Sequence, residues 1–131
     1  MLGTFVTFAA PPSKSTPAGA ELAEDLRRLL GTSFSVSERF LRGDYGWEFE
    51  VSRGRNRFLL ILQLSDAWLL IVVPLKRFLG VLGRPSEAAL LELARAVHEA
   101  LRSAGASSLG WFTRRGFETR APAAPRPEDA T

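Results

Sequence analysis

The middle of the chain alternates between apolar and polar residues with a period of two. From Tyr45 to Val51 every second residue is aromatic or β-branched, and the residues between them are glycine or glutamate. This pattern is typical of a strand that buries one face. The sequence therefore predicts a strand here, followed by a turn at residues 53–56, in which Gly54 and Asn56 tolerate a positive φ angle.

Two nearly continuous apolar runs follow this turn, Phe58–Leu64 and Ala67–Val73. Apolar runs without alternation are typical of central strands that are covered on both faces. Periodicity alone also permits one buried helix across both runs, which together fall short of the about 20 residues that a membrane-spanning helix needs. Because Ser65 and Asp66 interrupt the apolar sequence at its midpoint and Pro74 ends it, we predict two strands joined by a tight turn.

Two other segments carry apolar residues at the spacing of an amphipathic helix. The first begins at Thr16 and Pro17, a side-chain cap followed by a residue with a fixed φ angle, and ends at Gly31. The second runs from Ser86, which caps it, to Ala104. The apolar stripes consist of Leu22, Leu26, Leu29 and Leu30 in the first segment, and of Leu90, Leu93, Ala94, Val97, Leu101 and Ala104 in the second.

Shorter strands are predicted at residues 4–8, 33–41 and 108–113. The element order is then β-α-β-β-β-β-α-β. Two helices on one face of a mainly antiparallel sheet make a two-layer α+β sandwich. We predict a single α+β domain over residues 1–118, and a flexible tail rich in proline and alanine over residues 119–131.

The composition is that of a globular protein rather than a disordered chain, with 46% hydrophobic and 24% charged residues among 131. Arginine far outnumbers lysine, and together with abundant alanine, glycine, leucine and proline this is typical of GC-rich bacterial genomes. The net charge of +3 is therefore weak support for a nucleic-acid partner. Residues 1–10 are apolar but lack the basic start and the length of a signal peptide, so we predict a bacterial cytoplasmic protein without a membrane span.

The residue types that most often perform catalysis are scarce. The chain has no cysteine, which excludes disulfides, thiol catalysis and thiolate metal sites. Its one histidine, His98, lies in the second predicted helix near the border of the apolar stripe, and we interpret it as a helix-flank side chain. No nucleophile-elbow motif is present, and one imidazole does not make a histidine zinc site. We predict no cofactor and no catalytic activity.

Three carboxylates offer an alternative chemistry. Asp44, Glu48 and Glu50 share the polar face of the alternating strand. Such a cluster can bind Mg²⁺ or perform acid–base catalysis. The same residues also make an ordinary solvated strand face, which is the interpretation that we favour. A metal-dependent enzyme that uses these three carboxylates is therefore an alternative hypothesis.

Arginines gather at the turn after the alternating strand. Arg53, Arg55 and Arg57 lie there, and a basic tip beside aromatic residues can hold RNA or DNA. No RNA-recognition, KH or helix-turn-helix signature is present, so nucleic-acid binding through this hairpin is a second alternative. The candidate partner-binding residues are the three arginines of the hairpin and the three tryptophans, Trp47, Trp68 and Trp111.

The predicted sheet has more apolar surface than two helices cover, because the strands around Ile61 and Ile71 are apolar on both faces. Extended apolar surface on a soluble protein usually marks an interaction site. Either residues 74–85 or the N-terminal strand fold over the second face, or that face meets a partner through Leu59, Ile61, Leu69 and Ile71, or through their alternating neighbours. The leading hypothesis is a non-enzymatic protein-binding module of the immunity-protein or secretion-chaperone kind, whose partner is another protein or a second copy.

Overall fold

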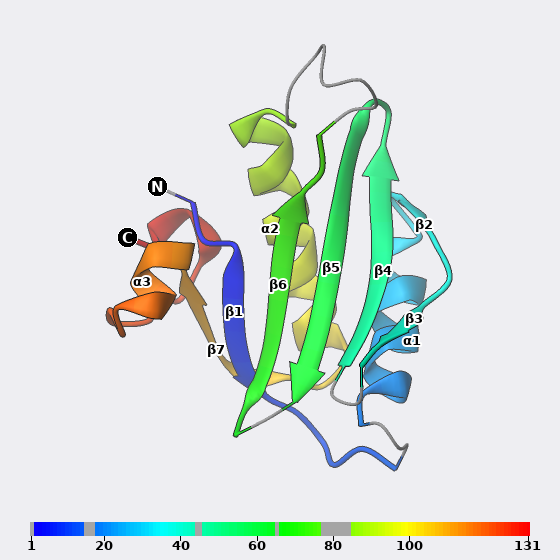
Figure 1. Cartoon of the computed structure of the whole chain (residues 1–131), viewed down its shortest axis with the longest axis horizontal. Helices are drawn as coiled ribbons and strands as arrows, with labels where there is room; N and C mark the ends of the chain where they lie inside the picture. The colour runs from blue at the N-terminus through cyan, green and yellow to red at the C-terminus, as the bar shows by residue number, and fades with distance from the viewer. Residues whose placement is uncertain (1, 15–17, 44–45, 65, 77–84) are drawn as a thin grey trace.

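The computed structural model describes residues 2–14, 18–43, 46–64, 66–76 and 85–131. The strands form one seven-stranded antiparallel sheet in the order β2-β4-β5-β6-β1-β7, in which β3 also pairs with β4 (Figure 1). The elements are β1 (Phe5–Ala9), α1 (Ala20–Leu30), β2 (Ser35–Val36), β3 (Phe40–Arg42), β4 (Gly46–Arg53), β5 (Asn56–Leu64), β6 (Trp68–Pro74), α2 (Glu87–Ser103), β7 (Ser107–Phe112), α3 (Arg114–Glu118) and a 3-10 turn, η1 (Pro127–Asp129).

The two long helices, α1 and α2, lie side by side against one face of the sheet, behind it in Figure 1. Their leucine stripes are buried beneath the sheet, as the helical spacing predicts. The predicted two-layer α+β sandwich is confirmed. The core between the layers contains Phe49, Leu60, Leu62, Leu70, Val72, Leu26, Leu93, Val97, Leu101 and Trp111.

The three central strands follow the predicted meander rather than the alternative single helix. β4 and β5 are joined by a two-residue turn, where Gly54 has φ of 58° and Arg53 pairs with Asn56. A left-handed φ favours glycine because it has no Cβ to collide with the backbone. Such a short loop fixes the register of the hairpin, so that every paired residue of β4 and β5 keeps its side chain on a defined face.

The predicted strand at residues 33–41 is divided into β2 and β3. Between them regular pairing is interrupted at residues 37–39, where Ser37 keeps one backbone hydrogen bond to Glu50 and also contacts a helix. The Oγ of Ser37 accepts a hydrogen bond from the N–H of Glu50 at 2.8 Å, and its carbonyl oxygen accepts one from Nε of Arg27 at 2.6 Å. The polar side chains of this stretch thus compete with regular strand pairing.

Of the two predicted helix starts, the structure confirms one and does not describe the other. Ser86 caps α2 as predicted, because its Oγ accepts a hydrogen bond from the N–H of Ala89 at 3.1 Å. The predicted cap of the first helix at Thr16 and Pro17 lies outside the described residues, and the described helix begins after Gly19, which has φ of 106°. Residues 77–84 of the predicted covering connection also lie outside the described part of the chain.

The C-terminal segment requires a correction, because the structure packs residues 119–131 against β7 and α2 rather than away from the core. Trp111 and Ala124 form an antiparallel bridge, with N···O distances of 2.7 and 2.9 Å between their backbones. Ala124 and Ala130 are core residues, and the N–H of Gly3 donates to the carbonyl oxygen of Pro127 at 2.7 Å. The small side chains that suggest a loose tail are those that fit closely beside an edge strand.

Candidate partner-binding face

The face of the sheet opposite α1 and α2 carries a row of apolar residues. Paired residues in neighbouring strands point to the same face of a sheet. One continuous row of partners crosses the sheet from β3 to β7, and a second, shorter row lies beside it. The first row is Phe40, Glu48, Ile61, Ile71, Phe5 and Phe112, and the second is Glu50, Leu59 and Val73.

We call the apolar residues of this surface over β3, β5 and β6 the open face. It consists of Phe40, Leu59, Ile61, Leu69, Ile71 and Val73. Within the described residues, no helix lies over these strands on this side of the sheet (Figure 1). Ile61 is 7% and Leu69 is 8% exposed, Leu59, Ile71 and Val73 are half-buried, and Phe40 is 56% exposed. The open face therefore has a shielded centre and an accessible rim.

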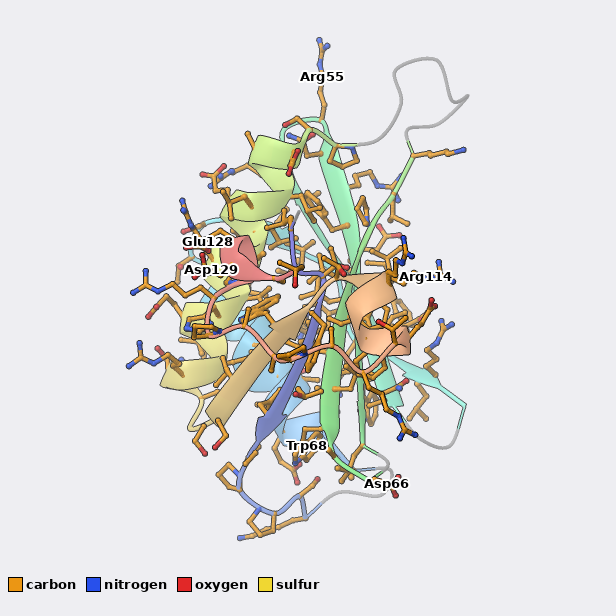
Figure 2. All side chains as sticks on the ribbon, turned by 90° about the vertical axis from the view of Figure 1, so that its left-hand side faces the viewer. Arg55, Asp66, Trp68, Arg114, Glu128 and Asp129 are labelled. Atoms are coloured by element: carbon orange, nitrogen blue, oxygen red, sulfur yellow. The ribbon has the colours of Figure 1, made fainter. Side chains whose placement is uncertain are left out.

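The short helix α3, which the sequence analysis does not predict, covers the neighbouring end of the same face. Its Phe117 ring lies 5.1 Å from that of Phe5 on β1 and 5.7 Å from that of Phe112 on β7, measured between centroids. Figure 2 shows α3 on the opposite side of the sheet from α1 and α2. Thr113 caps the helix by accepting a hydrogen bond from the N–H of Gly116 at 2.9 Å. The open face begins where this cover ends.

Arginine–glutamate pairs lie beside the open face and, at Glu48, between Phe40 and Ile61 within it. On β3 and β4, Nη1 of Arg42 donates to Glu48 at 2.7 Å. On β4 and β5, Nη2 of Arg57 donates to both carboxylate oxygens of Glu50, at 2.9 and 3.1 Å. On α3, Nε of Arg114 donates to Glu118 at 3.2 Å. Each of these three pairs joins one positive and one negative side chain.

The same pairs bear on the predicted metal cluster. Glu48 and Glu50 lie on one face of β4, but each carboxylate is engaged by its own arginine. The third predicted ligand, Asp44, lies outside the described residues. Across the part of the chain that the structure describes, no three histidine or acidic side chains are placed to hold a metal ion. The metal-dependent enzyme therefore stays an alternative hypothesis, of which the structure describes only the two arginine-paired glutamates.

The three tryptophans lie on the helical side of the sheet, away from the open face, and their role in partner binding stays a prediction. Trp111 is fully buried, and Trp68 is buried with its ring stacked on Phe8, 6.1 Å between centroids. Trp47 is partly buried, with the Arg39 guanidinium 4.7 Å from its ring centroid. The alternation of the strand already indicates the buried position of Trp47, because this residue shares the face of core residues rather than the face of the glutamates.

The three arginines of the hairpin point in different directions. Arg53 turns to the helical side, where it pairs with Glu92 of α2 and lies 4.5 Å from the ring centroid of Phe34. Arg57 lies on the opposite face with Glu50. Arg55 projects from the tip of the hairpin (Figure 2). The predicted arginines therefore do not form one continuous basic surface, which weakens the structural basis of the nucleic-acid hypothesis without testing it.

His98 has a structural contact of its own. Its Nδ1 accepts a hydrogen bond from the indole N–H of Trp111 at 2.9 Å, and this gives a buried donor its acceptor. The exposed edge of the histidine lines a polar pocket of about 250 Å³ between α2 and η1, together with Arg95, Glu99, Arg102, Arg126, Pro127 and Glu128. The helix-flank position predicted for His98 thus acquires a specific function in holding α2 against β7.

We expect His98→Leu to lower the free energy of unfolding by about 1–3 kcal/mol, because it leaves the Trp111 N–H buried without an acceptor. Urea denaturation of the variant measures this cost. The matched control is the same substitution in a Trp111→Phe background, where the donor is absent and His98→Leu should cost clearly less. An equal cost in both backgrounds would show that the hydrogen bond contributes nothing.

An ion-pair network fixes the segment that leads into β3. Nη1 of Arg27 donates to both carboxylate oxygens of Glu24 at 2.9 Å, and Nη1 of Arg39 donates to one of them. The hydrogen bond from Arg39 is the main cause that holds the pKa of Glu24 below its ordinary value of 4.5. Partial desolvation acts in the opposite direction and raises the pKa, whereas the charge of Arg27 lowers it further. The network positions the chain directly before Phe40 on the open face.

We expect Glu24→Gln to lower the free energy of unfolding at pH 7 by about 0.2–1 kcal/mol, the range for partly exposed ion pairs. Because the pKa of Glu24 is lowered in the folded state, its stabilising effect is complete above the ordinary value of 4.5 and is lost as the pH falls through the folded-state pKa. The stabilities of the parent chain and the variant should therefore converge in acid. Denaturation at pH 7 and pH 3 measures this, and a difference unchanged at pH 3 would contradict it.

Comparisons with known proteins assign no relative: no family model, no curated protein and no solved structure matches the chain. Among the described residues, no helix is long and apolar enough to cross a membrane.

Proposed function

We propose that this chain is a non-enzymatic module that binds a partner protein through its open face. The observation that carries the proposal is the apolar row at Phe40, Ile61 and Ile71, on the side of the sheet that α1 and α2 leave free. The exposed Phe40 and the half-buried Leu59, Ile71 and Val73 give this side of the sheet accessible apolar groups, and exposed apolar surface is typical of interaction sites. An immunity-type or chaperone-like protein of the bacterial cytoplasm is the concrete form of this function.

The character of the borders supports a protein partner. An interface between proteins combines an apolar centre with a polar rim. The open face combines both kinds of residue, because the half-buried Ile71 and Val73 lie near its middle and the Arg57–Glu50 pair lies at its border. The Arg42–Glu48 pair adds a polar site between Phe40 and Ile61. The carboxylates of the pairs would repel a polyanion, whereas the side chains of a protein offer groups of both signs.

Two neighbouring residues allow a matched test. Phe40 and Leu41 are 56% and 54% exposed, but Phe40 pairs with Glu48 on the open face and Leu41 pairs with Trp47 on the other. Phe40→Asp and Leu41→Asp therefore add the same charge at almost the same place, on opposite faces. Because both positions are exposed, we expect both variants to fold with little change in stability.

The experiment is affinity capture from the native host with the tagged parent chain and each variant. We expect a stoichiometric protein to be captured by the parent chain and by Leu41→Asp, and to be lost or reduced at least tenfold with Phe40→Asp. A protein captured equally by all three forms would place its binding elsewhere. Nucleic acid in the eluate, released by salt, would instead favour the hairpin of Arg53, Arg55 and Arg57.

A further inference from the structure

We infer that the partner contributes an amphipathic helix of two to three turns, which lies over β5 and β6 beside α3. This inference rests on the proposed function and specifies the chemistry of the partner segment. The open face offers three structural reasons for a helix: an existing helix on the same face, a matching spacing, and the lack of a suitable sheet edge.

The chain itself shows how a helix docks on this side of the sheet. α3 lies on the end of the face formed by β1 and β7, with Phe117 packed against Phe5 and Phe112. These two residues belong to the same cross-strand row as Ile71 and Ile61. The apolar surface that receives α3 therefore continues without interruption into the open face.

The spacing of the strands places the next helix. Neighbouring strands are about 4.8 Å apart, and packed helices are about 8–10 Å apart. A second helix in contact with α3 would thus lie about two strands farther along the sheet, over β6 and β5. Those two strands carry the apolar pairs Ile61–Ile71 and Leu59–Val73. The position set by helix packing coincides with the apolar centre of the open face.

The length of the apolar surface sets the length of the helix. From Leu69 to Val73 the surface extends over four residue steps of β6, or about 13 Å. A helix rises about 1.5 Å per residue, so about nine residues cover this distance. Apolar side chains at positions i, i+3 or i+4, and i+7 of the partner would contact the sheet. Its polar flanks would meet the Arg114–Glu118 pair on one side and the Arg42–Glu48 pair on the other.

An extended partner strand fits this sheet less well. Strand addition needs a free edge, but the β7 edge is occupied by the bridge between Trp111 and Ala124. At the other edge, β2 has two residues and β3 has three, which offer few backbone groups. A second copy has no free helix to contribute among the described elements, because the stripes of α1 and α2 are buried beneath its own sheet.

The test is selection of binders from a display library of random 16-residue peptides against the immobilised full chain. We expect the enriched sequences to repeat apolar residues at helical spacing, and the peptides to gain helical circular dichroism on binding. Ile71→Asp should weaken their binding at least tenfold, and Leu41→Asp, on the opposite face, should leave it unchanged. The selected peptides should also displace the native partner.

Several outcomes would overturn the inference. These are enrichment of sequences with a period of two, binders that do not depend on Ile71, a selection without any binder, or a dimer formed through the open face in analytical ultracentrifugation. The failure of the proposed function is a different result, since it appears as native-partner capture that Phe40→Asp does not alter. If capture depends on Phe40 and helical peptides do not compete with the partner, the helix alone is excluded.

Discussion

Leu70→Asp is expected to unfold this protein, whereas the same change at the next residue, Ile71→Asp, is expected to leave it folded. Leu70 is fully buried in the core on the helical side of the sheet, between Leu62 and Val6 on the neighbouring strands. An unpaired carboxylate there costs several kcal/mol, and the whole stability of a domain is about 5–15 kcal/mol. Ile71 points to the open face, where the new carboxylate reaches water.

The measurement is urea denaturation of both variants, with heteronuclear NMR spectra to establish the native fold. We expect native spectra and a loss below about 2 kcal/mol for Ile71→Asp, and the spectrum of an unfolded chain for Leu70→Asp. Leu70→Ala is a milder variant at the same position and should cost about 2–5 kcal/mol through the cavity it leaves. Equal stability of the two aspartate variants would show that the two faces are assigned wrongly. The contrast also establishes Ile71→Asp as a usable probe of binding.

The meander is predictable from sequence because its signals are local. The alternation from Trp47 to Val51 and the short turn at Gly54 both act between residues that are close in the chain. The apolar runs of β5 and β6 are different, because residues on both faces look alike in sequence. Only the three-dimensional structure shows that Leu62 and Leu70 meet the helices while Ile61 and Ile71 do not.

The predicted partner-binding residues stay a prediction, and the structure shows only where they lie. Tryptophan is common in interfaces, but it is also a large apolar side chain that fills cores. Trp111 and Trp68 fill the core here, and the sequence offers no partner pattern that overrides this use. Phe40, which we propose as a binding residue, carries no signal in the sequence, because the property that distinguishes it is exposure at the sheet edge. Exposure depends on the interruption of regular pairing at residues 37–39, which is a tertiary effect.

Sequence patterns also do not predict the two segments that pack on β7, which are α3 and residues 119–131. α3 has five residues, too few for a helical periodicity, and its position depends on the contact of Phe117 with Phe5, far away in the chain. Residues 119–131 have the composition of a linker, and composition does not record the pairing of Ala124 with Trp111. Gly110 is a partial indication that another segment packs closely on β7, because a Cβ at this position would lie 2.7 Å from that of Ala123.

Removal of residues 122–131 is expected to destabilise the protein by about 2.5–5 kcal/mol. The deletion uncovers Trp111, which is fully buried in the complete chain, and removes the acceptor of the Gly3 N–H. Uncovering about 100–200 Å² of apolar surface at about 25 cal/mol per Å² gives this range. Hydrogen exchange should show the same effect locally, with protection lost at the amides of Gly3 and Trp111.

Two adjacent alanines separate specific packing from a general effect of the segment. Ala124 is buried against the core, and Ala123 is exposed. Ala124→Asp should approach the cost of the deletion, because it buries a charge beside β7, whereas Ala123→Asp should change the free energy of unfolding by less than about 1 kcal/mol. A tail that does not contact the core would give equal, small effects for both variants and for the deletion. Since the segment closes the β7 edge, its loss should also promote association through the freed strand, which analytical ultracentrifugation measures as a concentration-dependent increase in mass.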